Sequence, residues 1–224
     1  KRGGGVGYLR VDTNGIRLPP HRMDALIDAV SPEVPFLLVF TLDAQTAKTY
    51  EAVKGVDALE RVRKNIRYLI RRRSQTGAAL NIQLQFVVQP GNEHEAGDFL
   101  QYWSDLLDCQ GGVQWHDELM FKRLSVGGGA EGQAAADTLY EETMERFGIR
   151  AGQAGGATVV VWEARPWQED DGHSGERGAC PGLWLTPVIR HDGALMMCCA
   201  DLRGELALGN LSEPGFRALW DGPS

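Results

Sequence analysis

The sequence lacks several features that would assign it to a broad class. None of its apolar runs approaches the roughly 20 residues that a membrane-spanning helix needs. It has 23 Lys and Arg against 30 Asp and Glu, a net charge of −7, so a general nucleic-acid-binding surface is not expected, although a local basic patch is compatible with it. Four cysteines in 224 residues are too few for a disulfide-stapled secreted protein. Together with an amino end that has no signal-peptide pattern, these absences predict a cytoplasmic protein without membrane or nucleic-acid partners.

Three of the four cysteines lie in one stretch near the carboxyl end. Cys180 precedes an apolar run at 183–189, and Cys198 and Cys199 follow a second one. An Asp-Gly pair at 192–193, between the two runs, is a strong signal for a β-hairpin. Such a hairpin would bring the cysteines together, which predicts a metal or cluster site.

Upstream of the cysteines, runs typical of strands alternate with amphipathic stretches typical of helices. Strands are expected at 6–11, 36–43, 80–88 and 157–162, and helices at 21–30, 44–54, 56–73, 93–107 and 134–147. Residues 111–120 fit neither pattern well, although a short strand around Val113 is compatible with them, and 127–133 has the composition of a flexible insertion. Alternating units of this kind predict right-handed βαβ crossovers and a parallel sheet or barrel.

Polar residues follow the predicted strands. They are Thr13, Asn14, Thr41, Asp43, Gln89, Asn92, Glu163 and Arg165. Each alone is more typical of a turn or a cap, but functional groups of parallel α/β folds gather at the carboxyl ends of strands, so their recurrence favours a functional edge. Alternation within the strand at 80–88 would also point Gln83 and Gln85 into a polar interior.

Three consecutive arginines, 71–73, end the helix expected at 56–73. Cations at this position complement the partial negative charge of the carboxyl end of a helix. We therefore expect this run to stabilise the helix end rather than to bind a ligand.

Short motifs also occur in a fixed order along the chain. They are Thr-Asn-Gly at 13–15, Val-Phe-Thr-Leu-Asp at 39–43, Asn65 within the next long helix, Asn92 after the next strand, Cys180, Gly193, Cys198-Cys199, Asp201, Gly204, Gly209-Asn210 and Trp220. The first part of this series resembles the later strands of the radical S-adenosylmethionine (SAM) enzymes. The part from Cys180 onward is similar to the SPASM extension of that family, which binds an auxiliary iron–sulfur cluster.

The resemblance implies an α/β fold in two parts. Residues 1–167 would form the carboxyl-terminal part of a partial (β/α)6 TIM-like barrel, and residues 168–224 an incomplete SPASM-like segment. The family's Cys-x3-Cys-x2-Cys motif, which holds the SAM-cleaving cluster, and its Gly-Gly-Glu-type segment are absent. Further cysteines normally follow the Trp220 region. We therefore expect a chain truncated at both ends and inactive by itself.

The resemblance also implies cluster ligands. Cys180 and Cys198 are the expected ligands of an auxiliary 4Fe-4S cluster, with Cys199 as a further ligand or a neighbouring thiol, so the ligand set is incomplete in this chain. Two alternatives stay open. The three cysteines could be buried structural thiols, or they could hold zinc together with His191 or His173.

In the implied barrel, SAM or the substrate would meet side chains at the carboxyl ends of the strands. Thr41 and Asp43 are placed to contact the ribose or the substrate, with Thr13, Asn14 and Gln85 on neighbouring strands. The reaction expected from the resemblance is reductive cleavage of SAM to a 5′-deoxyadenosyl radical, which would modify a peptide or a small molecule.

The resemblance predicts an oxidoreductase or maturase that works with an electron donor such as ferredoxin or flavodoxin. The alternative is a non-catalytic remnant of the fold that binds a peptide or a partner protein.

Overall fold

The computed structural model describes residues 8–111, 117–126, 130–161, 187–198, 201, 203–212 and 215–221. The chain divides into two compact units, Lys1–Glu163 (unit 1) and Ala164–Ser224 (unit 2). None of the helices in the described ranges is long and apolar enough to cross a membrane.

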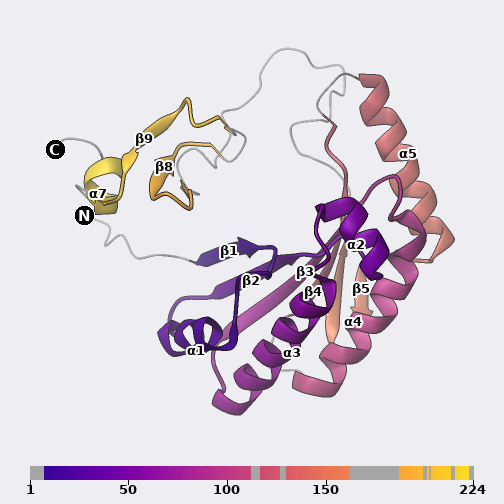
Figure 1. The fold of residues 1–224 in the computed structure, drawn as a ribbon, viewed down its shortest axis with the longest axis horizontal. Coiled ribbons are helices and arrows are strands. Elements are labelled where there is room, and N and C mark those ends of the chain that lie inside the picture. The colour runs from indigo at the N-terminus through magenta and orange to yellow at the C-terminus, as the bar shows by residue number, and fades with distance from the viewer. Residues whose placement is uncertain are drawn as a thin grey trace. The chain divides into compact units, whose positions relative to one another are not determined.

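Unit 1 alternates strands with helices, as the sequence pattern predicts (Figure 1). Its elements are β1 (Leu9–Thr13), α1 (Pro20–Ala29), β2 (Phe36–Thr41), α2 (Ala47–Lys54), α3 (Leu59–Thr76), β3 (Leu80–Val88), the 3-10 helix η1 (Glu93–Glu95), α4 (Ala96–Gly111), β4 (Glu118–Arg123), α5 (Ala130–Arg146), β5 (Gly152–Ala154) and β6 (Ala157–Val161).

Within the described residues, the strands of unit 1 form a six-stranded sheet in the order β1-β2-β3-β4-β6-β5. The pairs β1–β2, β2–β3, β3–β4 and β4–β6 are parallel, and only the short pair β5–β6 is antiparallel. This arrangement confirms the α/β class with a parallel sheet. Three details differ from the expectation. The strand β4 lies at 118–123, and Val113, around which a strand was expected, is outside the described residues. The strand β5 was not predicted, and α5 begins at Ala130, inside the expected insertion.

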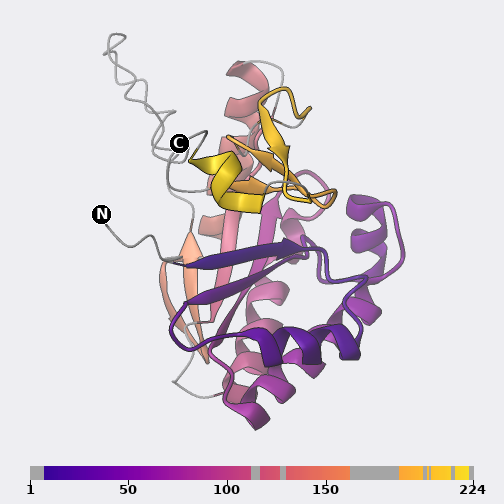
Figure 2. The same cartoon turned by 90° about the vertical axis from the view of Figure 1, so that its left-hand side faces the viewer.

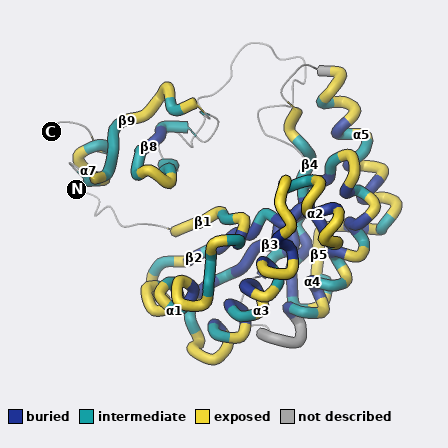
Figure 3. Tube along the Cα trace, in the orientation of Figure 1, coloured by how far each residue is buried: buried dark blue, intermediate teal, exposed yellow. Residues whose placement is uncertain are grey.

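The two faces of this sheet differ sharply in polarity. One face carries a continuous apolar layer, in which paired residues such as Phe40, Leu84 and Leu119 are fully buried. Side chains from α1, α3, α4 and α5 join the same cluster, so these helices cover this one face. Figure 2 shows the sheet from the side, and Figure 3 shows that burial concentrates in the strands beneath the helices.

The opposite face of the sheet presents polar side chains between apolar ones. Val39, Gln83 and Glu118 form one row across β2, β3 and β4, and Gln85 and Met120 belong to the next row toward the carboxyl ends. Both glutamines are buried, at 2 and 3% exposure. Gln83 and Gln85 therefore share the face opposite the helices, as the alternation predicts, and the polar interior that they were expected to line stays a prediction.

The arginine run at 71–73 does not end α3, which continues to Thr76. Arg73 is fully buried, and its Nη1 and Nη2 donate to the two carboxylate oxygens of Asp117, each at 2.6 Å. Asp117 in turn accepts a hydrogen bond from the backbone N–H of Ile82 at 2.8 Å. The helix-dipole interpretation is thus wrong for Arg73, whose guanidinium joins α3 to the amino ends of β3 and β4.

Unit 2 contains β7 (Val188–Ile189), β8 (Ala194–Met196), β9 (Ala207–Asn210) and the helix α7 (Gly215–Trp220). The strands form an antiparallel sheet in the order β7-β8-β9. Leu195 and Met196 are its buried apolar residues among those described. A Cβ atom at Gly209, whose φ is 146°, would lie 2.7 Å from Leu219, so α7 packs against β9 at a distance that only glycine allows.

Candidate functional site

The Thr-Asn-Gly turn after β1 is held by its own side chains. Thr13 Oγ1 accepts a hydrogen bond from the N–H of Gly15 at 3.0 Å, and Asn14 Oδ1 accepts one from Ile16 at 3.1 Å. Asn65 of α3 donates to the carbonyl of Gly15 at 2.9 Å. Gly15 has φ of 73°, and a Cβ atom there would lie 2.9 Å from the Phe40 ring. These contacts give Thr13 and Asn14 a turn-forming role, and their expected contact with a cofactor stays a prediction.

Asp43 lies just past the carboxyl end of β2 and is buried. Its φ of 57° is in the left-handed region, which Asp tolerates better than most residues. Oδ1 accepts from the N–H of Val87 at 2.7 Å, Oδ2 pairs with Lys54, and the backbone carbonyl accepts from Asn92 at 2.9 Å. Burial, and then the charge of Asp43, raise the pKa of nearby Tyr50. The Asp43 carboxylate therefore joins neighbouring elements at this edge.

Thr41 and Gln85 are neighbours at the same edge, because they are paired across β2 and β3. Gln85 Nε2 donates to Gln83 Oε1 at 2.6 Å, and the amide of Gln83 donates to the Glu118 carboxylate. Thr41 lies in the same row as Gln85 and Met120 and is half-buried. A ligand at this edge could hydrogen-bond to the Thr41 hydroxyl, whereas Gln85 would have to exchange an existing partner.

Glu95 is a residue of this edge that the sequence pattern did not single out. Its carboxylate is buried and accepts hydrogen bonds from the N–H groups of Gln45 and Thr46 at 2.5 and 3.1 Å. The hydroxyls of Thr46 and Thr49 donate to its other oxygen at 2.5 and 2.7 Å. Burial acts to raise the pKa of Glu95, but these hydrogen bonds outweigh it and lower the pKa. Thr46 is the N-cap of α2, and the Glu95 carboxylate from η1 thus holds the segment that leads into this helix.

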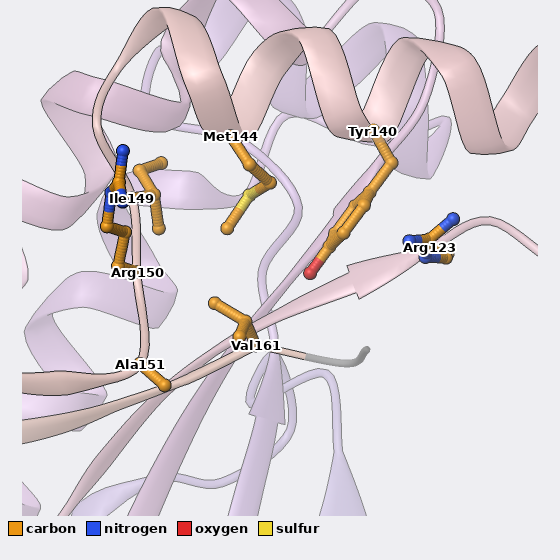
Figure 4. Close-up of a pocket in the computed structure, with 7 residues that line it drawn as sticks. All are labelled: Arg123, Tyr140, Met144, Ile149, Arg150, Ala151 and Val161. Carbon is orange, nitrogen blue, oxygen red and sulfur yellow. The ribbon is translucent and has the colours of Figure 1, made fainter. Parts of the chain in front are cut away.

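A cavity of about 450 Å³ lies between α5 and the carboxyl ends of β4 and β6 (Figure 4). It is lined by Arg123, Tyr140, Met144, Ile149, Arg150, Ala151 and Val161. The Arg123 guanidinium carbon lies 4.8 Å from the centre of the Tyr140 ring, and its Nη1 contacts Glu141 at 3.1 Å. Val161 is paired with the core residue Phe121, so the cavity is on the helix-covered face, and its described lining residues include none of the predicted site residues.

In unit 2, Cys198 follows β8 directly and is half-buried. The loop after it is organised by Asp201, whose N–H donates to the carbonyl of Cys198 at 3.2 Å. The Asp201 carboxylate accepts from the N–H groups of Gly204, Glu205 and Leu206 at 2.9, 3.1 and 2.6 Å. The bond from Leu206 and the other backbone donors lower the pKa of Asp201. Asp201 therefore has a turn-forming role in this loop.

Of the other residues expected at the cluster, the structure describes only His191. Cys180, Cys199 and His173 lie outside the described residues. His191 is exposed in the turn between β7 and β8, whereas Cys198 follows the far end of β8, so a zinc ion shared by His191 and Cys198 is disfavoured. The part of the chain that the structure describes contains no group of three or more His, Cys, Asp or Glu residues that could hold a metal.

The donor chemistry of the loop nevertheless fits an iron–sulfur cluster. A half-buried thiol on a backbone fixed by an aspartate is a suitable thiolate ligand. Residues 180–224 match a family model described as SPASM, an iron-sulfur cluster-binding domain. This match supports the resemblance to radical SAM proteins that carry a SPASM domain. A search of curated proteins finds no match to the chain.

Proposed function

We propose that this chain is part of a radical SAM oxidoreductase that modifies a peptide or a small molecule. The observation that carries the proposal is the SPASM match at 180–224, in a chain whose upstream unit is a parallel α/β sheet. SPASM domains bind iron–sulfur clusters, and the parallel sheet supplies the edge at which α/β enzymes gather functional groups.

In this proposal the sheet of unit 1 belongs to a partial (β/α)6 barrel. At one side, the antiparallel strand β5 closes the sheet beyond β6. At the other side, β1 has four exposed residues out of five, including Leu9 and Val11, both more than 40% exposed. Strands of parallel sheets are normally covered on both faces, so the exposure of β1 supports the addition of further βα units there.

The cofactors of the proposed enzyme are SAM and iron–sulfur clusters. Cys180, Cys198 and Cys199 would hold the auxiliary 4Fe-4S cluster, together with a donor from outside the given sequence. The 224 residues contain no Cys-x3-Cys-x2-Cys motif, so the ligands of the SAM-cleaving cluster would also lie outside it. The clusters would supply electron transfer, and the electrons would come from a ferredoxin- or flavodoxin-type donor.

The residues of unit 1 would bind and orient SAM and substrate rather than perform chemistry. Thr41 is half-buried and is paired with Gln85, which hydrogen-bonds to Gln83, so its hydroxyl is available to a ligand at this edge. Asp43 and Asn92 fix the loops that follow β2 and β3, so they would set the shape of the edge. Thr13, Asn14 and Gln85 would contact the ligand only by exchanging their present hydrogen bonds.

The proposal is tested on the full-length gene product, reconstituted anaerobically with iron and sulfide. We expect cluster absorbance, tightly bound iron, and release of 5′-deoxyadenosine from SAM when a reductant is added. Negligible iron together with no 5′-deoxyadenosine would contradict the enzyme and favour the non-catalytic remnant.

The auxiliary site is tested separately by substituting single cysteines. Cys198→Ser should lower the iron content and alter the electron paramagnetic resonance signal of the auxiliary cluster. Cys109→Ser, in α4, is the matched control and should leave both unchanged. Equal iron loss in the two variants would argue against Cys198 as a ligand.

A further inference from the structure

The helix α3 carries a concentration of positive charge that the core of the protein does not require. It has seven Lys and Arg and one Glu, a net charge of +6. The whole chain has a net charge of −7, which leaves −13 for all other residues. Four of the seven cations are exposed: Arg61, Lys64, Arg67 and Arg71. These four residues, here called the basic face, span about 15 Å along the helix axis.

The basic face does not contribute to stability through ion pairs. Among the described residues, none of its four cations contacts a carboxylate, whereas the half-buried Arg63 and Arg72 pair with Glu60 and Asp24. Its members follow one another at spacings of three or four residues, at which like charges repel and destabilise a helix. Like charges that weaken their own helix, without ion pairs to offset the repulsion, point to a role outside folding.

Two of these arginines are also held in fixed positions. The Arg67 guanidinium lies 5.7 Å from the centre of the Tyr102 ring and donates to the Tyr102 hydroxyl. The Arg71 guanidinium lies 5.6 Å from the centre of the Tyr68 ring. Fixing long side chains before association lowers the entropy that binding would cost. The exposed positions of α3 therefore form a partly preorganised surface (Figure 3).

We propose that the basic face of α3 is a docking surface for an acidic segment of a partner protein. A compact acidic patch matches both its charge and its length. An extended polyanion fits less well. The neighbouring helices α1 and α4 expose Asp28, Asp98 and Asp105, and these carboxylates would repel negative charge that extends beyond the basic face. Charge pairing of this kind favours fast, salt-sensitive and transient association.

The surface can be tested on the 224-residue chain without iron, so the result is independent of the proposed enzyme activity. The probe is a fluorescein-labelled peptide of alternating Glu and Gly, followed by fluorescence anisotropy at low ionic strength. The test variant is Arg61→Gln, Lys64→Gln and Arg71→Gln combined. The control is Arg17→Gln, Lys48→Gln and Arg146→Gln combined, which removes the same charge from exposed positions of unit 1.

We expect the test variant to bind the peptide roughly tenfold more weakly and the control to change affinity by less than about twofold. The melting temperature of the test variant should stay the same or rise, because like-charge repulsion is removed. No binding by the wild type, or equal loss in both variants, would overturn the proposal. Tighter binding of single-stranded DNA or of phosphatidylserine vesicles than of the peptide would also overturn it, in favour of nucleic acid or lipid.

Discussion

In the described part of unit 1, several helices cover one face of a wide sheet, and aromatic rings such as Phe86, Phe99 and Trp103 are fully buried between them. The described part of unit 2 has short strands, one short helix and two buried apolar residues, Leu195 and Met196. Hydrophobic burial grows with the size of a domain, so unit 1 can stabilise itself by burial, whereas a unit as small as unit 2 usually needs a disulfide or a metal.

The two units also differ in the sequence distance that their polar contacts span. In unit 1 the charged groups Arg73, Asp117 and Glu95 are buried and connect elements that are far apart in the sequence. In unit 2 the carboxylate of Asp201 bonds only to nearby backbone. Long-range polar contacts therefore hold unit 1 in shape, and short-range ones shape the loop of unit 2 at which the cluster is proposed to bind.

The largest effect is expected from Arg73→Ala. It leaves the buried carboxylate of Asp117 without its cation, which should lower the free energy of unfolding of unit 1 by about 3–5 kcal/mol. Urea unfolding followed by circular dichroism measures the change. The neighbouring variant Arg72→Ala, which breaks a surface pair with Asp24, is the control and should change little. If both variants lowered the free energy of unfolding by a similar amount, the buried pair of Arg73 with Asp117 would not be more important than the surface pair of Arg72.

A smaller loss is expected from Gly15→Ala, because φ of 73° is strained for alanine and the new Cβ would press against Phe40 and Val62. The two contributions together should cost roughly 2–4 kcal/mol. Gly55→Ala, at φ of 71° with open space around it, isolates the backbone contribution. If both variants lost the same stability by urea unfolding, the close contact at Gly15 would be unimportant.

Glu95→Gln should cost about 1–2 kcal/mol, because the charge is lost and one of the two acceptor oxygens becomes an amide NH2, which cannot accept from the donors that face it. Because the pKa of Glu95 is lowered in the folded state, its contribution is present above the ordinary carboxyl pKa of about 4.3 and is lost as the pH falls through the folded-state value. Wild type and variant should therefore differ in stability near neutral pH and converge in acid. Parallel stability curves from pH 7 down to about 3 would rule out this role.

The smallest effect on global stability is expected from Asp201→Asn. Its contacts are local, so urea unfolding of unit 1 should not change, but the backbone N–H groups of Gly204, Glu205 and Leu206 should exchange faster by NMR. In the wild type the protection of these N–H groups, measured relative to the intrinsic exchange rate at each pH, should be lost as the pH falls through the lowered pKa of Asp201. Asp221→Asn is the control. A lower free energy of unfolding of unit 1 in Asp201→Asn would show that the contacts of Asp201 are not local to unit 2.

Much of unit 1 could be predicted because its strands have strong local signals. The strand β3 begins and ends where the pattern expects it, and β2 is a continuous apolar run. The strand β4 was missed because its polar face, with Glu118 and Lys122, interrupts the apolar signal. The strand β5 has three residues and exists only through its pairing with β6.

The site was harder to predict because its contacts join distant parts of the chain. The arginine run gave no sign that Asp117, 44 residues later, would pair with Arg73 inside the protein. Likewise, Glu95 reads as a surface residue until α2 is placed beside it. Asp201, by contrast, bonds to residues three to five positions away, so its contacts lie within a short stretch of sequence.

The exposed strand β1 also has a practical consequence for work with the isolated chain. Leu9 and Val11 are each more than 40% exposed on a strand that ends the sheet, and so is Tyr8, which precedes it. Unpaired apolar edges of this kind are templates for strand pairing between molecules, which leads to aggregation. Recombinant preparations of these 224 residues should therefore lose monomer as concentration rises, and a lysine in place of Val11 should slow that loss.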